Sequence, residues 1–402
     1  MAQPEFDVVL YGATSFVGQI MSRYLFARHG AKSLRWAMAG RSRSKLEEVR
    51  ATLGAGGEAV PLIVAEATDE ESLKQMCART RVIATTVGPY ALYGNTLVKV
   101  CAEGGTDYCD LTGEVQWIAR MIAAHEGAAK RSGARIVHCS GFDSLPSDLG
   151  VHVVQREAKK KFGLPCTRVK YRVKGFRGGF SGGTVASMMN VMREAAADPT
   201  LRQNLNDPYW IAPSDTSRPA QPDVRFAAFD ADLDAWVSPF VMAAINTRIV
   251  HRSNVLSGMT YGKEFRYDEA VMAKGRMSAV GQSLGIAAFM GMMALGPTRA
   301  LLERLVPKPG EGPTPQQQEH GFFDIRVLGI TAQGDQLQVK VYGDRDPGYG
   351  STGKMLGEAA ACLALDLPKG QPGGGFWTPA TSYGDKLVDR LRAHAGVTID
   401  VV

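Results

Sequence analysis

The sequence predicts an α/β protein, in which an N-terminal doubly wound parallel sheet is followed by a second, α+β domain. The first 150 of its 402 residues hold six short apolar runs that alternate with amphipathic stretches. Strands that alternate with helices in this way favour a parallel sheet over an all-β or all-α fold. Past residue 150 the alternation gives way to longer strand patterns, loops and a hairpin. We therefore expect a first domain over residues 1–150 and a second over 151–345.

The first strand–helix unit carries a glycine turn. The apolar run 6–11 ends at Gly12, and the turn opens into an amphipathic helix near Gly18. Gly12 allows a sharp turn, Gly18 allows the helix to pack close to the strand, and the helix N-terminus would bind a pyrophosphate. Ser15 stands where this dinucleotide fingerprint usually has its middle glycine, so an ordinary strand–helix turn is the alternative interpretation. The predicted cofactor-binding residues of the turn are Gly12, Ala13, Thr14, Ser15, Phe16, Val17 and Gly18.

A basic cluster follows the second predicted strand, residues 34–39. Arg41 lies about 20 residues past the glycine turn, where an NAD-binding chain carries an acidic residue for the ribose hydroxyls. Arg41, Ser42 and Lys45 instead suit a 2′-phosphate, through charge-assisted hydrogen bonds. A solvated basic helix start is the alternative, but cations are unfavourable at a helix N-terminus unless an anion is present. The cluster therefore favours NADP(H) over NAD(H), and with it a Rossmann domain.

The other strands of the first domain are expected at residues 60–65, 81–87, 106–111 and 135–139. Before the third helix, Thr68 and Glu71 form the pattern of a capping box. In a doubly wound sheet the loop after the fourth strand flanks the cofactor crevice, so this loop would approach the nicotinamide end. Its predicted cofactor-binding residues are Val87, Gly88, Pro89 and Tyr90.

The second domain is expected to contain a strand over residues 166–174, then a glycine-rich loop over 178–184 and a methionine-rich helix. A further strand is predicted over 248–256. The runs 322–330 and 336–342 flank a Gln-Gly-Asp turn and predict a hairpin. We expect this mixed region to supply a substrate pocket and an oligomer contact.

Residues 284–295 form an apolar segment without charge, bracketed by Arg276 and Arg299. The segment is too short to span a bilayer, which needs about 20 apolar residues. One interpretation is a buried helix or a contact in a homodimer. The other is a lid, or an element that lies on a membrane surface, either of which would serve a lipid-like substrate.

Composition and motifs argue against several classes of function. The net charge of +6 is modest and spread along the chain, which argues against nucleic-acid binding. The six cysteines form no C-x-x-C pair and the polar N-terminus shows no signal peptide, so a cytoplasmic protein is expected, with membrane association only through 284–295. His138 and Cys139 would point to opposite faces of a strand, so no metal site is assigned. Residues 348–355 have the spacing of a phosphate-binding loop, but Met355 replaces the magnesium-binding hydroxyl, and we expect a turn into a helix.

Motifs spread over nearly the whole chain carry a resemblance to a known family. They lie at residues 12–18, 39–42, 87–90, 107–114, 141–148, 236–240, 246–256, 348–355 and 375–380. The set resembles the saccharopine dehydrogenase-like oxidoreductases, and within them the branch of the mycobacterial trans-acting enoyl reductases. The resemblance implies a Rossmann domain that binds NADP(H), a second α+β domain, and C-terminal helices over 346–402 that return to the first domain. It also implies reduction of a carbon–carbon double bond in a bulky lipid-like or polyketide acyl chain.

The expected reaction is hydride transfer from NADPH to the β-carbon of an α,β-unsaturated acyl substrate, followed by protonation of the α-carbon. The Tyr-x-x-x-Lys pair of the short-chain dehydrogenases is absent from the sequence and is excluded as the proton source. The candidate catalytic residues are Tyr90 as the proton donor, Asp143 to orient the nicotinamide or the substrate, and Ser144 as a hydrogen-bond donor. Bound water is the alternative source of the proton.

Two other functions stay open at this point. A saccharopine-type amino-acid or imine dehydrogenase would need cations that converge on several substrate carboxylates. The residues that would supply them are Arg168, Arg172, Lys174 and Arg177. A non-catalytic NADP(H)-binding sensor or scaffold would instead keep the phosphate-binding turn without any turnover.

Overall fold

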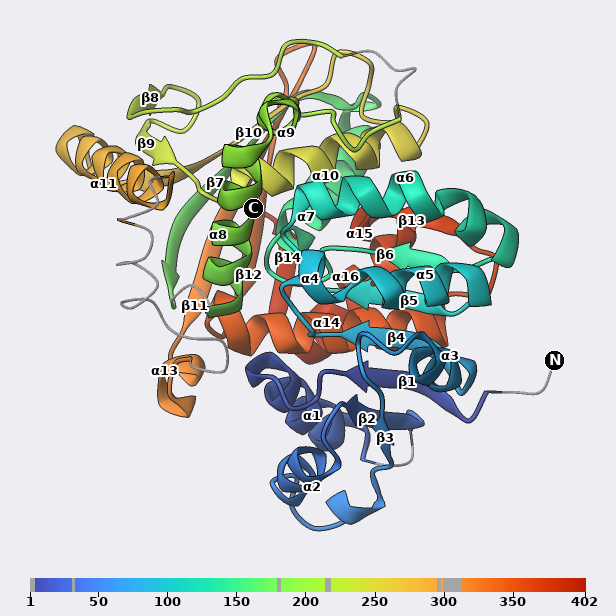
Figure 1. Ribbon diagram of the computed structural model, residues 1–402. Coiled ribbons are helices and arrows are strands. Elements are labelled where there is room, and N and C mark those ends of the chain that lie inside the picture. The colour runs from blue at the N-terminus through green and yellow to red at the C-terminus, as the bar shows by residue number, and fades with distance from the viewer. Residues whose placement is uncertain (1–3, 31–32, 179–181, 214–217, 295–297, 299–311) are drawn as a thin grey trace.

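Sheet A is the first of two seven-stranded sheets in the computed structural model, which describes residues 4–30, 33–178, 182–213, 218–294, 298 and 312–402 (Figure 1). Its strands are all parallel, in the order β13-β6-β5-β4-β1-β2-β3. The order of the first six is that of a Rossmann sheet, so the predicted fold class is confirmed. The strands are β1 (Phe6–Tyr11), β2 (Trp36–Gly40), β3 (Leu62–Val64), β4 (Thr80–Thr85), β5 (Asp107–Asp110), β6 (Arg135–Val137) and β13 (Gly375–Trp377).

Helices cover both faces of sheet A. Side chains alternate along a strand, so Val8 and Leu10 of β1 enter one core while Val9 and Tyr11 enter another. The first core includes residues of α1, α2 and α14, and the second includes residues of α3, α5 and α6. These helices are α1 (Phe16–His29), α2 (Arg43–Ala51), α3 (Glu70–Ala78), α5 (Asn95–Gly104), α6 (Val115–Ser132) and α14 (Thr352–Ala361), with short α4 (Tyr90–Tyr93) and a 3₁₀ turn at Gly57–Ala59 between them in sequence.

The cap of helix α3 differs from the prediction. The Asp69 carboxylate accepts hydrogen bonds from the backbone N–H groups of Glu71 and Ser72, at 3.0 and 3.2 Å. The prediction of Thr68 as the capping residue is therefore wrong. An N-cap carboxylate satisfies free N–H groups and also carries negative charge toward the positive end of the helix dipole, which a hydroxyl does not.

Sheet B is a mixed sheet in the order β14-β12-β11-β7-β10-β9-β8. Strands β7 and β10 pair in parallel, and the other neighbours pair antiparallel. The predicted hairpin is confirmed as β11–β12, and the strand predicted over 166–174 is confirmed and extends to Arg177. The strands are β7 (Cys166–Arg177), β8 (Ala228–Asp230), β9 (Ala235–Pro239), β10 (Arg266–Ala273), β11 (Phe322–Thr331), β12 (Gln336–Gly343) and β14 (Val397–Val401).

Helix α7 packs on strands β7, β11, β12 and β14 of sheet B, and helix α10 packs on α7 and β10. Helix α10 (Ala243–Leu256) replaces the strand predicted over 248–256, so that prediction is wrong. Ile249 and Val250 favour a strand by local propensity, but the helix is buried on most of its sides, and tertiary packing overrides propensity there. The other helices here are α7 (Leu145–Phe162), α8 (Gly182–Ala197), α9 (Pro199–Asn204), α11 (Arg276–Ala294) and α13 (Pro315–Glu319). None of the helices in the described part of the chain is long and apolar enough to cross a membrane.

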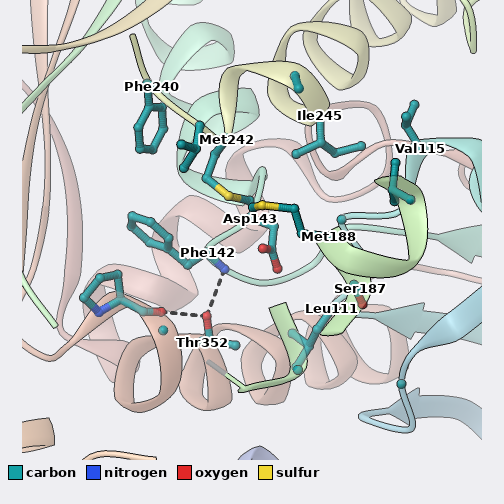
Figure 2. Close-up of a pocket in the computed structure, with 18 of the residues that line it drawn as sticks. Leu111, Val115, Phe142, Asp143, Ser187, Met188, Phe240, Met242, Ile245 and Thr352 are labelled. Carbon is teal, nitrogen blue, oxygen red and sulfur yellow. Dashed lines mark hydrogen bonds between the residues drawn. The ribbon is translucent and has the colours of Figure 1, made fainter. Parts of the chain in front are cut away.

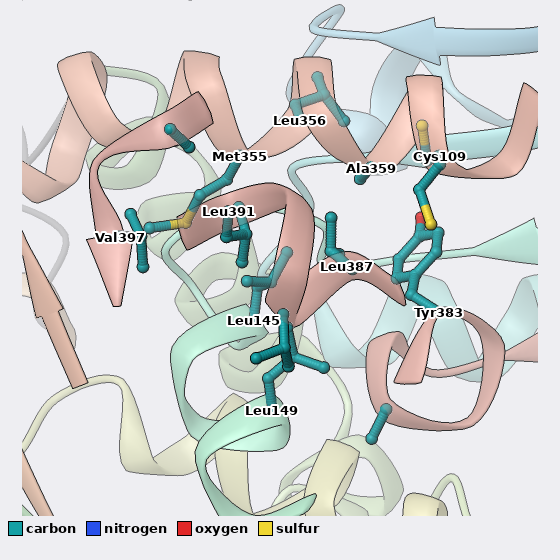
Figure 3. Packing of buried hydrophobic residues seen from close by; sticks show 14 of the residues in the cluster. Cys109, Leu145, Leu149, Met355, Leu356, Ala359, Tyr383, Leu387, Leu391 and Val397 are labelled. Carbon is teal, nitrogen blue, oxygen red and sulfur yellow. The ribbon is translucent and has the colours of Figure 1, made fainter. Parts of the chain in front are cut away.

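The C-terminal segment packs against both sheets. Helix α14 follows a turn at Pro347–Ser351, as expected for 348–355, and contacts α1, β4 and β5. Figure 3 shows Met355 of α14, Leu391 and Val397 packed with Leu145 and Leu149 of α7. Besides its helices, the segment adds one strand to each sheet, β13 to sheet A and β14 to sheet B. The domain boundaries at residues 150 and 345 stay a prediction. The remaining elements are α15 (Pro379–Ser382), α16 (Gly384–Arg390) and π-helical turns at Cys362–Asp366 and Leu391–Ala395.

Candidate active site

A cavity of about 540 Å³ lies at the carboxyl ends of β1, β4, β5 and β6, where sheet A faces sheet B and helices α8, α10 and α11. This edge of a doubly wound sheet is where such folds bind ligands. The glycine turn lines one part of the cavity, and the loops after β4, β5 and β6 line the next. The contributing residues of sheet A and its loops are Ser15, Phe16, Val17, Thr86, Gly88, Tyr90, Leu111, Gly113, Val115, Phe142 and Asp143.

The glycine turn has the close approaches that its sequence predicts. Gly12 has a φ of 91°, and a Cβ atom there would lie 2.7 Å from Thr86 Oγ1. A Cβ atom on Gly18 would lie 2.1 Å from the carbonyl oxygen of Gly12. Ser15 caps helix α1, because its Oγ accepts a hydrogen bond from the Gly18 N–H at 2.9 Å. The serine that departs from the fingerprint therefore orders the helix N-terminus at which a pyrophosphate would bind.

A second residue, Thr86, ties the turn to the end of β4. Its Oγ1 donates a hydrogen bond to the Gly12 carbonyl at 2.9 Å and lies 2.8 Å from Ser15 Oγ. We did not single out Thr86 from the sequence. The available signal was its place directly after the fourth strand, next to the predicted Val87–Tyr90 contacts.

The basic cluster lies at the carboxyl end of β2. Arg41 is exposed and makes no hydrogen bond or ion pair within the described part of the chain. Ser42 caps helix α2, and the first turn of that helix carries no acidic residue. Arg43 is paired with Glu47 at 2.9 Å, which leaves Arg41 and Lys45 as the cations available to a ligand. The arrangement fits a phosphate group beside the ribose of a dinucleotide.

Asp143 is the carboxyl group of the cavity. It lies half-buried in the loop between β6 and α7, and Figure 2 shows its carboxylate among Phe142, Met188 and Met242. Burial raises the pKa of the Asp143 carboxyl to about 7; a backbone hydrogen bond opposes that shift and the Asp110 carboxylate adds to it. A carboxyl group that holds its proton near neutral pH can act as a general acid.

The rest of the cavity wall is mainly apolar and comes from sheet B and its helices (Figure 2). Strand β7 contributes Val173 and Phe176, and the connection from β9 to α10 contributes Pro239, Phe240, Val241 and Met242. Methionines of α8 and α11 complete the wall, and methionine adapts its shape to bulky apolar ligands. The further apolar residues of the wall are Met188, Val191, Met192, Leu205, Ala244, Ile245, Ile286 and Met290.

Comparison with known proteins decides the family. Residues 8–137 match the model of the saccharopine dehydrogenase NADP binding domain. The trans-acting enoyl reductase of Mycobacterium ulcerans is 39% identical over 418 residues, covering 99% of this chain and 98% of that protein. A Mycobacterium tuberculosis protein, whose name assigns the same activity provisionally, is 42% identical over 98% of this chain and 97% of its own length.

The chain belongs to the saccharopine dehydrogenase-like family, in its trans-acting enoyl reductase branch. The resemblance drawn from the motifs is thereby confirmed. The saccharopine dehydrogenase (L-Glu forming) of Saccharomyces cerevisiae has the same fold, with a TM-score of 0.53, 13% sequence identity and 99% coverage of both chains. The family match makes residues 8–137 an NADP(H)-binding domain. The glycine turn and the basic cluster lie within this range, and their geometry fits a pyrophosphate and a 2′-phosphate.

Replacing Gly18 by alanine should damage the cofactor site of this family member. The new Cβ atom would clash with the Gly12 carbonyl, so the turn or helix α1 must move. We expect NADPH affinity to fall at least about tenfold and the free energy of unfolding to fall by about 1–3 kcal/mol, as for other overpacked sites. Calorimetric NADPH titration and urea unfolding measure the two effects.

Gly104→Ala is the matched control, because Gly104 lies at the end of helix α5 with no heavy atom within 4 Å of an added Cβ. Alanine is the better helix former, so this variant should keep its NADPH affinity and its stability. Unchanged NADPH affinity in Gly18→Ala would show that the turn does not hold the cofactor.

Two of the predicted catalytic residues, Tyr90 and Ser144, make hydrogen bonds within the protein through their hydroxyls. The Tyr90 hydroxyl donates to the Thr85 carbonyl and accepts from the Leu111 N–H, both at 3.1 Å, and burial raises the Tyr90 pKa well above its usual value. The buried Ser144 hydroxyl donates to Asn246 Oδ1 at 2.8 Å and does not line the cavity. Both hydroxyls therefore already make hydrogen bonds to other groups of the protein. The positions of Tyr90 and Ser144 in the sequence do not reveal these bonds.

A buried carboxylate that the sequence analysis did not single out, Glu114, joins three elements beside the cavity. It accepts hydrogen bonds from the N–H groups of Tyr90 and Ala91, at 2.7 and 3.0 Å, and from Ser187 Oγ at 2.8 Å. Burial raises the pKa of Glu114, and these hydrogen bonds oppose the shift. Ser187 belongs to α8, so the carboxylate links that helix of the cavity wall to the Rossmann domain. The sequence feature that points to Glu114 is its place as an acidic residue directly before the apolar start of α6.

The cations proposed for a saccharopine-type substrate do not converge on the cavity. Arg172 is buried and paired with Asp230 and Asp268, at 2.8 and 2.5 Å, and Arg168 pairs with Asp232 at 3.6 Å. Lys174 and Arg177 are exposed. None of the four lines the cavity, whose wall from the same strand consists of Val173 and Phe176.

The apolar segment forms part of α11, on the surface of the second sheet. One side of this helix contributes Ile286 and Met290 to the cavity. The helix is not buried as a whole, because 57% of Leu284 is exposed. Residues 295–297 lie outside the described part of the chain. Whether the outer side of α11 contacts a membrane or a second copy of the chain stays a prediction.

Proposed function

We propose that this protein reduces the carbon–carbon double bond of an α,β-unsaturated, bulky acyl substrate at the expense of NADPH. The observation that carries the proposal is the Asp143 carboxyl, which holds a proton near neutral pH in a mainly apolar cavity at the NADP-binding edge of sheet A. The names of the related mycobacterial proteins support the same reaction class.

The cofactor supplies the hydride, which adds to the β-carbon, and the α-carbon then needs one proton to complete the saturated product. We assign that proton to the Asp143 carboxyl. The apolar wall binds the acyl chain and excludes water, which favours proton transfer from a fixed group. Gly12 to Gly18 would hold the pyrophosphate, and Arg41, Ser42 and Lys45 would hold the 2′-phosphate. Val87, Gly88 and Pro89 would flank the cofactor beyond them.

Tyr90 acts in this proposal as a positioning residue. Its hydroxyl joins the carboxyl ends of β4 and β5, and its N–H binds Glu114. The loops that approach the nicotinamide and the substrate therefore share one rigid support. Ser144 supports the loop of Asp143 in the same way, through its hydrogen bond to Asn246 on α10.

A substrate panel tests the proposal. NADPH consumption is followed with enoyl thioesters of increasing chain length, the matching saturated thioesters, and a set of imino acids. We expect turnover of the long enoyl thioesters only, with the saturated product identified by mass spectrometry. Turnover of imino acids alone would support the saccharopine-type alternative and overturn the proposal. NADPH binding without turnover of any member would support the sensor or scaffold alternative.

A further inference from the structure

We propose that Arg248 binds the anionic end of the acyl substrate, as a carboxylate or a phosphate, inside the same cavity. The proposal rests on the proposed function for the acyl nature of the ligand and adds a binding group that selects its polar end. Arg248 belongs to α10 and lines the cavity one turn after Ala244 and Ile245, which line it as well. Within the described residues, no other lysine, arginine or histidine lines this cavity.

The hydrogen bonds of Arg248 all go to neutral oxygen atoms, so its positive charge has no carboxylate partner among the described residues. Its terminal nitrogens donate to the backbone carbonyls of Ala244 and Leu205 and to Thr247 Oγ1. Its Nε is buried and has no hydrogen-bond partner among the residues that the structure describes. Neutral carbonyl oxygens satisfy N–H groups but do not balance a positive charge as a carboxylate does.

The other buried arginines of the described residues each lie close to a carboxylate, which balances their charge. Arg135 lies 2.6 Å from Asp107, Arg172 lies 2.8 Å from Asp230, and Arg252 lies 3.8 Å from Glu126. Arg248 is only 6% exposed, yet it has no carboxylate within 4.0 Å in the described part of the chain. Arg252 is the closest comparison, because it lies four residues later on the same helix, donates to backbone carbonyls, and does not line the cavity.

The surroundings of Arg248 favour an external anion. Burial lowers the pKa of Arg248 to about 10, with some opposition from the more distant Asp207 and Asp223, so the group stays charged at neutral pH. Asp143 is the one carboxyl group among the described residues that line the cavity, and it is largely protonated below its pKa of about 7. An anion that enters the cavity would therefore meet an unpaired, weakly hydrated guanidinium, which suits carboxylates and phosphates.

The side chains of the cavity wall indicate more closely which class of ligand fits. One cation in an apolar cavity fits an amphiphile with a single anionic end, and it does not fit a substrate with several carboxylates. Saturated ten-carbon probes test this without any reduction. They are decanoate, decyl phosphate and decanol, which share one chain length and differ in the head group.

Isothermal titration of the full chain measures their binding. We expect the unsubstituted protein to bind decanoate, decyl phosphate or both about 10- to 100-fold more tightly than decanol, the range that hydrogen bonds to a charged group provide. Tighter binding of decanoate would identify a carboxylate as the anionic end of the ligand, and tighter binding of decyl phosphate would identify a phosphate. Arg248→Met should remove the preference and leave decanol binding unchanged, whereas Arg248→Lys should keep part of it. Equal affinities for all three probes in the unsubstituted protein would overturn the proposal.

Two further outcomes of these titrations also have a defined interpretation. If Arg248→Met does not fold, the head-group comparison in the unsubstituted protein and in Arg248→Lys still decides the question. A retained anion preference in folded Arg248→Met would also overturn the proposal. Since no probe is a reducible substrate, a failure of the reductase function would show in the substrate panel and would not alter these affinities.

Discussion

Replacing Asp143 by asparagine should lower kcat for enoyl reduction by about 100- to 10,000-fold, the contribution that a general acid makes in other enzymes. Asparagine has nearly the same shape but cannot release an acidic proton. The residue lies in the cavity wall and not in the glycine turn or basic cluster, so the Kd for NADPH should change little. Steady-state NADPH consumption and calorimetric NADPH titration measure the two quantities.

The pH dependence gives a second readout of the same group. The pKa of Asp143 is raised to about 7, so the carboxyl carries its proton below that pH and loses it above. We expect kcat/KM to be constant at acidic pH and to fall about tenfold per pH unit above pH 7, because the fraction of the free enzyme that carries a protonated Asp143 falls. The residual activity of Asp143→Asn should lack this decline. An unchanged profile in Asp143→Asn would show that another group, or water, supplies the proton.

Tyr90→Phe is the matched control for this experiment. It removes the hydroxyl that joins Thr85 and Leu111, and with it support for the loops. Its activity should fall less than that of Asp143→Asn, and its rate should keep the decline above pH 7. Loss of the pH dependence in Tyr90→Phe would restore Tyr90 as the acid.

The second large effect is expected at Arg41. Replacement by aspartate should weaken NADPH binding by about 100-fold or more, because it removes charge-assisted hydrogen bonds and places a negative charge beside the 2′-phosphate. NADH lacks that phosphate, so its affinity should change by only a few-fold. The ratio of the two dissociation constants, measured by fluorescence titration, gives the effect directly.

Arg43→Asp is a close control, since Arg43 lies two residues away but is engaged with Glu47. It changes the net charge by the same amount, and we expect a much smaller change in the NADPH to NADH ratio. Raised ionic strength should weaken NADPH binding to the unsubstituted protein, because Arg41 is exposed and its interaction is screened. Equal losses for NADPH and NADH in Arg41→Asp would contradict a 2′-phosphate contact.

The class of cofactor was predictable because the sequence signals for it are local. The Gly12 turn, the Ser15 cap and the Arg41 cluster each lie within a few residues, and strand–helix alternation places them at one edge of a parallel sheet. The function of Ser15 as a cap, and the hydrogen bond of Thr86 to the Gly12 carbonyl, needed the structure. The substrate half was less predictable, because the wall around Asp143 combines β7, α8, α10 and α11.

Tyr90 and Asp143 show why the substrate half of the site was less predictable from the sequence. Both residues follow strands of sheet A, and sequence position ranks Tyr90 first as an acid. In the fold, two backbone partners occupy the Tyr90 hydroxyl, while apolar side chains distant in sequence raise the pKa of Asp143. Hydrogen-bond partners and desolvation are properties of the assembled neighbourhood and leave no local pattern.

The periodicity and glycine spacing of the first 150 residues were enough to establish the Rossmann sheet and the class of cofactor, because both depend on short-range steric and electrostatic rules. The strand assigned to 248–256 failed for the opposite reason. That segment became helix α10 because burial and long-range hydrogen bonds outweigh its local strand propensity. The same packing places Arg248 in the cavity wall with only neutral oxygen partners among the described residues. Which acyl chain enters, and which end of it is held, therefore depends on contacts that only the folded chain brings together.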